Sequence, residues 1–184
     1  MTNSKLSVKN ICLCGLMTAL IAICSWISIP LGEVPFTLQT FAIFLAIGLL
    51  GGKLGTISVV AYVLLGAVGV PVFAGFTSGF GIIMGTTGGY LVGFILSALA
   101  IWLIEHIFGR KPIVSIISML IGMLIYYVIG TVWFMVIYTH NTGAVGLGAV
   151  LGWCVIPFII PDLVKIALAF IITNRVNKYV HVTA

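Results

Sequence analysis

The sequence predicts an all-α integral membrane protein, a compact bundle of six transmembrane helices that forms a single domain over residues 1–184. Of the 184 residues, 62% are hydrophobic and only 6% are charged, whereas about 25% of the residues of a soluble domain are charged. So few charged side chains cannot cover the surface of a soluble protein, and the outer surface must therefore face lipid. A helix of about 20 residues spans the hydrocarbon core of a bilayer, so a chain of this length holds about six such helices with their connections.

Glycine, proline and charged residues divide the chain into the expected helices. The first is expected to end before Pro30 and the second before Gly51, and a break is expected at Pro112. Pro157 and Pro161 are expected to kink the last segment or to divide it into a re-entrant piece and a helix. The expected helices cover residues 8–29, 37–50, 53–68, 84–108, 113–138 and 144–176.

Seven of the eight Lys and Arg residues fall on one side of this six-helix arrangement. The loops on the other side contain no Lys or Arg, and their one charged residue is Glu33. Because cytoplasmic loops are enriched in Lys and Arg, we expect both termini in the cytoplasm and the chain in the cell membrane. The seven residues are Lys5, Lys9, Lys53, Arg110, Lys111, Arg175 and Lys178.

Several functional classes are disfavoured by the sequence. The net charge of +5 comes from scattered basic residues without a nucleic-acid-binding motif. The cysteines have no C-x-x-C spacing and no His partner, so neither a metal nor a cofactor is expected. No phosphate-binding loop of the form G-x-x-x-x-G-K-[ST] occurs, so the chain does not hydrolyse a nucleotide by that route. No Ser/His/Asp or Cys/His set is present, and an enzyme is therefore not expected.

Asp162 and Lys165 are charged residues inside the last apolar segment. Three positions apart on a helix, they share one face, and ionisable residues within a membrane usually face the bundle interior or a cavity. They form either an ion pair that locks the helix against a neighbour or a polar anchor for a solute. The anchor is favoured, because apolar residues replace a purely structural pair at little cost. Glu105 is instead expected to have a structural role, paired with Arg110 or with solvent.

Glycine and aromatic residues are interspersed between residues 69 and 94. Irregular backbone at membrane depth is tolerated where protein buries it or where it lines a cavity. This composition suits a pocket wall where the backbone approaches a flat ligand, and an ordinary flexible outer loop is the alternative. Gln39 and Thr40, near the outer end of the second expected helix, are candidates to join such a pocket.

Five segments taken together resemble the BioY family, the biotin-specific S components (substrate-binding membrane subunits) of energy-coupling factor (ECF) transporters. Two departures concern loop geometry more than substrate: residues 85–90 read GTTGGY where the family often has GPTGGY, and residues 160–162 read IPD where it often has PGD. The resemblance extends from about Val34 to Lys165. Its segments are 35–40 (PFTLQT), 64–73 (LLGAVGVPVF), 87–94 (TGGYLVGF), 122–130, and 157–159 (PFI) with Asp162 and Lys165.

The resemblance implies a subunit that captures biotin with high affinity from the outer side and docks on a coupling membrane subunit with two cytoplasmic ATPase subunits. These partners would supply the ATP hydrolysis that this chain lacks. The family's docking motif in the first helix is Ala-x-x-x-Ala, and its counterpart here is Gly15 with Ala19. An S component for a different vitamin and a solo biotin transporter are the alternatives.

The resemblance also implies a set of biotin-binding residues. Asp162 fits the ureido N–H groups, and Lys165 fits either the ureido carbonyl or the valerate carboxylate. The other expected ligand residues are Gln39 as a hydrogen-bonding group, Phe73, Tyr90 and Trp133 as apolar walls, and Gly75 and Gly88 as points where the backbone approaches the ligand.

Overall fold

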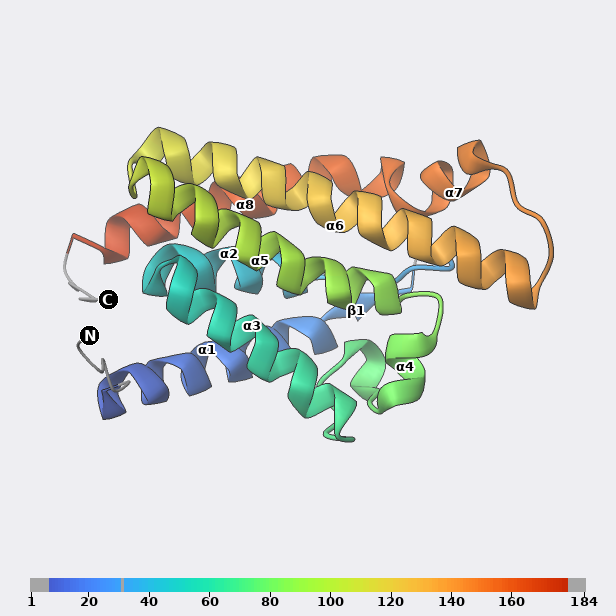
Figure 1. Cartoon of the computed structure of the whole chain (residues 1–184), viewed down its shortest axis with the longest axis horizontal. Helices are drawn as coiled ribbons and strands as arrows, with labels where there is room; N and C mark the ends of the chain where they lie inside the picture. The colour runs from blue at the N-terminus through green and yellow to red at the C-terminus, as the bar shows by residue number, and fades with distance from the viewer. Residues whose placement is uncertain (1–6, 31, 179–184) are drawn as a thin grey trace.

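A computed structural model describes residues 7–30 and 32–178 of this chain, which are mostly helical (Figure 1). A two-residue antiparallel pair, β1 (Ser28–Ile29) with β2 (Phe36–Thr37), and a 3-10 helix, η1 (Ala74–Phe76), interrupt the helices. The helices are α1 (Val8–Trp26), α2 (Gln39–Leu50), α3 (Gly52–Ala67), the short α4 (Phe80–Met84), α5 (Gly88–Phe108), α6 (Pro112–Asn141), α7 (Leu147–Cys154) and α8 (Ile156–Val176).

The helix α2 lies in the interior of the bundle. It contacts α1, α3, α5 and α8, and ten of its twelve residues are buried. A helix that is apolar on all sides is typical of such a position. The longer helices α5 and α6 pack side by side (Figure 1). A Cβ atom at Gly93 would collide with the Tyr126 backbone, so the absence of a side chain at this position permits the close approach of the two helices.

The outer faces of the long helices are apolar. Leu103 on α5 is 59% exposed and Val128 on α6 is 62% exposed, a distribution that suits contact with lipid. Four segments are long and apolar enough to cross a membrane, namely α1, α5, α6 and residues 147–176, which include both α7 and α8. The chain is a multi-pass membrane protein.

The expected count of six spans stays a prediction, because α2 and α3 are shorter than the four segments that are long enough to cross a membrane. They contain 12 and 16 residues, which correspond to about 18 and 24 Å at ~1.5 Å per residue. A hydrocarbon core is about 30 Å thick.

Several expected helix boundaries are wrong, and each has a local cause. The first helix ends at Trp26 and the second begins at Gln39, because the residues between them pair as β1 and β2. The expected helix 84–108 begins only at Gly88, since Gly85 adopts an extended conformation after α4. The last segment is divided at Val155 (φ −127°, ψ −59°).

The two prolines of the last segment occupy different places. Pro157 lies in the first turn of α8, where a missing N–H costs nothing. Pro161 lies inside the helix. The segment is divided, as one of the two expectations had it, but the break lies at Val155, before both prolines. The re-entrant character of its first piece stays a prediction.

One end of the bundle carries the basic residues. The start of α1, the α2–α3 turn, the α5–α6 turn and the end of α8 lie at the same end, on the left of Figure 1. This end therefore carries six of the seven basic residues named above, while Lys5 lies outside the described residues.

Glu105 and Arg110 link the helices at this end of the bundle. The Oε2 atom of Glu105 accepts a hydrogen bond from the N–H of Gly52 (3.0 Å), the first residue of α3. The same atom lies 3.7 Å from Arg110 Nε. Arg110 Nη2 donates to the Gly48 carbonyl near the end of α2. The carboxylate thus satisfies a helix N-terminus and the guanidinium a helix C-terminus, in agreement with the helix dipoles. The expected pairing of Glu105 with Arg110 is confirmed.

Candidate ligand-binding pocket

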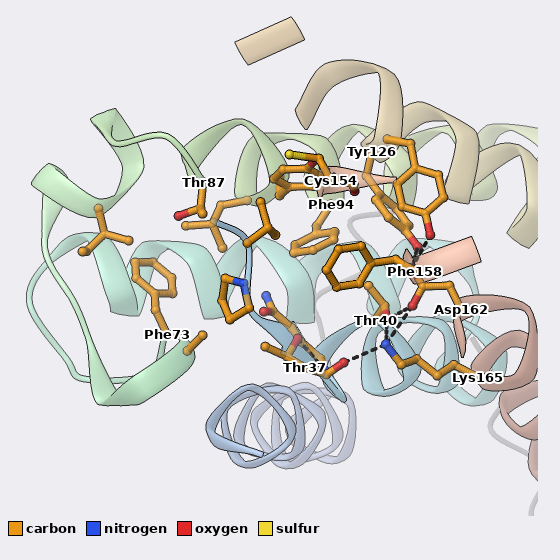
Figure 2. Close-up of a pocket in the computed structure, with 18 of the residues that line it drawn as sticks. Thr37, Thr40, Phe73, Thr87, Phe94, Tyr126, Cys154, Phe158, Asp162 and Lys165 are labelled. Carbon is orange, nitrogen blue, oxygen red and sulfur yellow. Dashed lines mark hydrogen bonds and ion pairs between the residues drawn. The ribbon is translucent and has the colours of Figure 1, made fainter. Parts of the chain in front are cut away.

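A cavity of about 280 Å³ lies between the N-terminal parts of α2, α5 and α8 and the middle of α6. This volume is near the lower end of the range of small-molecule sites, about 300–1,000 Å³. Aromatic rings form much of its wall, among them Phe73, Phe94 and Phe158, and the charged groups gather at one side (Figure 2). Such a division suits a ligand with an apolar body and a polar head group.

The charged side of the cavity is built on Asp162 and Lys165 of α8. Lys165 Nζ donates to Asp162 Oδ1 at 2.7 Å, to the Thr37 carbonyl at 2.7 Å and to Thr40 Oγ1 at 3.1 Å. It also lies 4.1 Å from the centre of the Phe36 ring, a favourable distance for a cation–π contact. The predicted common face of Asp162 and Lys165 is confirmed, and both residues are at least 95% buried.

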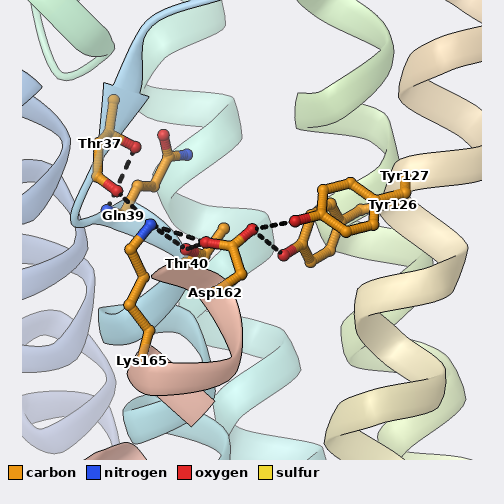
Figure 3. Close-up of polar contacts among 7 residues, drawn as sticks. All are labelled: Thr37, Gln39, Thr40, Tyr126, Tyr127, Asp162 and Lys165. Atoms are coloured by element: carbon orange, nitrogen blue, oxygen red, sulfur yellow. Dashed lines mark hydrogen bonds and ion pairs between the residues drawn. The ribbon is translucent and has the colours of Figure 1, made fainter. Parts of the chain in front are cut away.

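The second oxygen of Asp162 is held from α6. Its Oδ2 atom accepts hydrogen bonds from the hydroxyl groups of Tyr126 and Tyr127, each at 2.7 Å. The Thr40 hydroxyl donates to Oδ1 at 3.1 Å. Figure 3 shows the carboxylate between Lys165 and Thr40 on one side and the two tyrosines on the other. The network therefore joins α2, α6 and α8.

The pairing of β1 with β2 positions one member of this network. Thr37 is the last residue of β2, and α2 begins two residues later. The Thr37 carbonyl lies outside the α2 hydrogen-bond ladder, whose first helical bond is from Ala42 N–H to the Leu38 carbonyl. It is therefore available to Lys165.

Five of the eight expected ligand residues line the cavity. They are Gln39, Phe73, Tyr90, Asp162 and Lys165. The Nε2 atom of Gln39 is buried without a hydrogen-bond partner among the described residues, and its amide points away from the charged pair (Figure 3). A buried N–H without a partner is costly, and Gln39 therefore has donor capacity available to a ligand.

Gly75, Gly88 and Trp133 are not among the residues that line the cavity. Gly75 is exposed in η1, where its φ of +67° favours glycine. Gly88 lies against the backbone of Ile83, where a Cβ would collide. Trp133 Nε1 donates to the Gly85 carbonyl at 3.0 Å. The three residues shape the chain around the pocket, and their expected contact with a ligand has no geometric support.

Sequence reasoning missed Tyr126 and Tyr127. Both lie within an apolar stretch, where a tyrosine is normally interpreted as a residue that packs in the core. A signal was present nevertheless, because a buried Tyr hydroxyl usually requires a hydrogen-bond partner. Two consecutive tyrosines in the middle of a membrane helix therefore indicate a polar group on a neighbouring helix.

A second hollow lies on the outside of the bundle. It is an apolar groove of about 1030 Å³ between α1 and α3, and Gly15 and Ala19 line it. Both residues are exposed, and a Cβ at Gly15 would meet no atom within 4 Å. The glycine and the alanine of the expected docking motif thus leave an open surface.

The described residues offer no site for a metal ion. No group of three or more His, Cys, Asp or Glu residues lies close enough together in residues 7–30 and 32–178.

The sequence matches the family model of the BioY family over residues 1–182. The chain belongs to the BioY family. It is 44% identical to the biotin transporter BioY of Thermotoga maritima over 167 residues, which cover 89% of this chain and 93% of that one. It is 40% identical to the probable biotin transporter BioY of Pyrococcus horikoshii, over 94% of this chain and 98% of the relative.

A solved structure shares the fold of this BioY-family chain. It is the crystal structure of the S-component for biotin from an ECF-type ABC transporter, with a TM-score of 0.84 and 30% sequence identity. The similarity covers 98% of this chain and 96% of that one. These proteins are transporters, in agreement with the expectation that this chain is not an enzyme.

Proposed function

We propose that this chain is the biotin-binding membrane subunit of an ECF-type vitamin uptake transporter, which captures biotin from the outer side of the cell membrane. The observation that carries the proposal is the buried Asp162–Lys165 pair at one side of an aromatic-lined cavity, in a chain whose relatives are named as biotin transporters. Capture requires binding and no chemistry on the ligand.

The distribution of groups in the cavity suits the parts of biotin. The ureido ring has two N–H donors and a carbonyl, and it belongs at the polar side with Asp162 and Lys165. The apolar thiophane ring belongs among the aromatic side chains, including Phe73 and Tyr90. The unpaired Gln39 amide supplies a donor to a carbonyl or carboxylate oxygen of the ligand.

Equilibrium binding to the purified protein in detergent tests the proposal. Biotin is expected to bind with high affinity, whereas thiamine and riboflavin compete poorly, because neither combines a cyclic urea with an apolar ring and a short carboxylate chain. Tight binding of another vitamin and no binding of biotin would assign the chain to a different substrate.

The proposed topology has six membrane crossings with both chain ends in the cytoplasm. It is supported by the gathering of basic residues at one end of the bundle (Figure 1), which the positive-inside rule assigns to the cytoplasm. The short helices α2 and α3 cross as part of the bundle, since α2 is surrounded by protein. A reporter fused to the C-terminus should be active in the cytoplasm, and activity on the outer side would refute this topology.

The groove between α1 and α3 is proposed as the docking surface for the coupling membrane subunit, which joins the chain to two cytoplasmic ATPases. Close helix packing requires small residues such as Gly15 and Ala19. A Gly15→Leu substitution should leave folding and biotin affinity unchanged, since no atom lies within 4 Å of the new Cβ, but should abolish co-purification with the coupling subunit.

The matched control is Leu16→Trp, which enlarges an exposed side chain of α1 outside the groove and should leave co-purification intact. Liposomes that contain this chain alone should bind biotin without accumulating it. Accumulation would favour the solo transporter, and co-purification of the Gly15→Leu variant would refute the docking surface.

A further inference from the structure

A third hollow lies at the end of the bundle that carries the basic residues. It has a volume of about 230 Å³ and lies between the C-terminal parts of α2 and α8 and the first two turns of α6. It shares no lining residue with the aromatic-lined cavity described above, and the proposed topology places it at the cytoplasmic surface of the membrane. Its polar lining residues are Arg110, Ser115, Thr173, Asn174 and Asn177.

The charge around this hollow is positive. Arg110 lines it, and within the described part of the chain no acidic residue does. Glu105, which lies nearby, is already paired with Arg110. A negatively charged ligand is therefore attracted here and meets no unpaired carboxylate. Three further basic residues adjoin lining residues in the sequence, namely Lys111, Arg175 and Lys178.

The guanidinium of Arg110 has donors to spare. It carries five N–H groups, and among residues 7–30 and 32–178 its partners are the Gly48 carbonyl and the Glu105 carboxylate. The Arg110 side chain is 38% exposed, so its remaining N–H groups are accessible to a ligand. The planar guanidinium matches the geometry of a phosphate group, to which it donates two parallel hydrogen bonds.

The hydroxyl of Thr173 is a second, independent indication of a ligand. The residue is 7% exposed, and its Oγ1 atom has no hydrogen-bond partner in the described segments. A hydroxyl in a helix often donates to the carbonyl four residues earlier, as Thr18 and Thr56 do in this protein. A buried polar group without a partner is costly, and a ligand in the hollow would supply that partner.

An apolar wall distinguishes this hollow from a site for a free ion. Met119 and Phe170 line it, and on the same two helices Ile117 and Ile171 are 49% and 50% exposed, as suits contact with lipid chains. The helix α6 begins at Pro112, which also lines the hollow, and the N-terminus of a helix favours negative charge. Positive charge beside an apolar wall at the membrane surface matches the two parts of a phospholipid.

We propose that this hollow binds the phosphate group of an anionic membrane phospholipid from the leaflet on the basic side of the protein. Arg110 and Thr173 donate to the phosphate oxygens, the Asn174 amide is a further donor, and an acyl chain lies along the apolar faces of α6 and α8. Basic pockets between membrane helices on the cytoplasmic side are a known form of lipid head-group site. The bound lipid joins the ends of α2 and α8 to the start of α6 and so stabilises the bundle.

Thermal unfolding of the purified, extensively washed protein in detergent tests the proposal. Dioctanoyl phosphatidylglycerol should raise the melting temperature by about 5 °C at a concentration of about 100 times its Kd, because it binds the folded state. Dioctanoylglycerol, which lacks the phosphate, and sodium phosphate at matched ionic strength should cause no comparable shift.

Thr173→Val removes the unpartnered hydroxyl and nearly conserves the shape of the side chain. Without lipid it should melt at the same or a higher temperature than the wild type, since the lost hydroxyl has no protein partner. Its affinity for phosphatidylglycerol should nevertheless fall about tenfold. Arg110→Gln should lower the affinity at least as much. It also breaks the contact with Glu105, so the lipid-induced shift is compared and not the melting temperature itself.

The matched control is Arg175→Gln, which removes an exposed positive charge of α8 that does not line the hollow. It should keep the affinity for phosphatidylglycerol. An equal loss in this control would show attraction to the basic surface as a whole and would overturn the hollow as the site, as would unchanged affinity in both Thr173→Val and Arg110→Gln.

The other two compounds test which part of the lipid is bound. A shift of equal size with sodium phosphate would overturn the assignment to a lipid, and one with dioctanoylglycerol would overturn the role of the phosphate. Biotin affinity should be the same in Thr173→Val, in Arg175→Gln and in the wild type, so the result is independent of the proposed function.

Discussion

Removal of the Asp162 carboxylate should abolish most biotin binding and destabilise the fold at the same time. In Asp162→Ala, Lys165 loses its 2.7 Å ion-pair partner while it remains in a buried position. Removal of one member of a buried pair costs about 3–5 kcal/mol. The two tyrosine hydroxyls that Asp162 accepts also lose their partner, and a buried donor without a partner costs about 1–3 kcal/mol.

Loss of biotin affinity is expected to be about a hundredfold or more. Truncation of a buried, hydrogen-bonded charge costs about 2–5 kcal/mol of binding free energy, and about 1.4 kcal/mol corresponds to a factor of ten. Isothermal titration of detergent-purified variants measures the affinity, and the melting temperature without ligand measures the stability.

The double variant Asp162→Ala/Lys165→Met separates these two effects. It removes both buried charges, and apolar residues often replace a buried ion pair without loss of stability. The double variant should therefore melt at a higher temperature than Asp162→Ala while binding biotin equally poorly. Unchanged biotin affinity in Asp162→Ala would refute the assignment of the pocket, and equal melting temperatures of the single and double variants would refute the energetic account of the pair.

Two further substitutions test the fold around the site. Glu105→Ala leaves the buried Gly52 N–H without its 3.0 Å acceptor. Melting in detergent should therefore show a destabilisation of about 1–3 kcal/mol, while the biotin affinity stays unchanged. An equal loss of stability in the exposed control Glu33→Gln would contradict this reasoning. Gly66→Ala places a Cβ against the Phe73 ring, so it should destabilise the protein by about 1–3 kcal/mol and weaken biotin binding. The control Gly81→Ala, whose new Cβ meets no atom within 4 Å, should behave as the wild type in both assays.

The sequence predicts those features that depend on composition and on local spacing. The apolar composition identifies a membrane protein, and the three-residue spacing of Asp162 and Lys165 places both charges on one face of α8. These predictions succeed because a membrane helix satisfies its own backbone, so its position in the chain and the direction of its side chains follow from local rules.

Features that depend on contacts between distant segments were not predictable in this way. Tyr126 and Tyr127 belong to the site only because α6 packs near α8, more than thirty residues further along the chain. Trp133 fits an aromatic wall by its chemistry, but its indole N–H is directed at the Gly85 carbonyl. A single sequence without these contacts does not distinguish an aromatic residue that lines a cavity from one that fastens two helices together.

The late start of α2 frees a backbone group for the same polar network. A helix that began at Thr37, as the sequence suggested, would direct the Thr37 carbonyl to the N–H group four residues later. In the structure this carbonyl instead accepts a hydrogen bond from Lys165 at 2.7 Å, because Thr37 belongs to β2.

The short strand pair therefore provides Lys165 with an acceptor that a longer helix would have removed. Irregular backbone at membrane depth is tolerated where protein buries it or where it lines a cavity, and β2 meets this condition because Thr37 lines the cavity. The length of α2 and the place of the charged pair are thus two consequences of one arrangement: α2 begins only after the strand pair, and the backbone left outside the helix becomes part of the polar wall of the pocket.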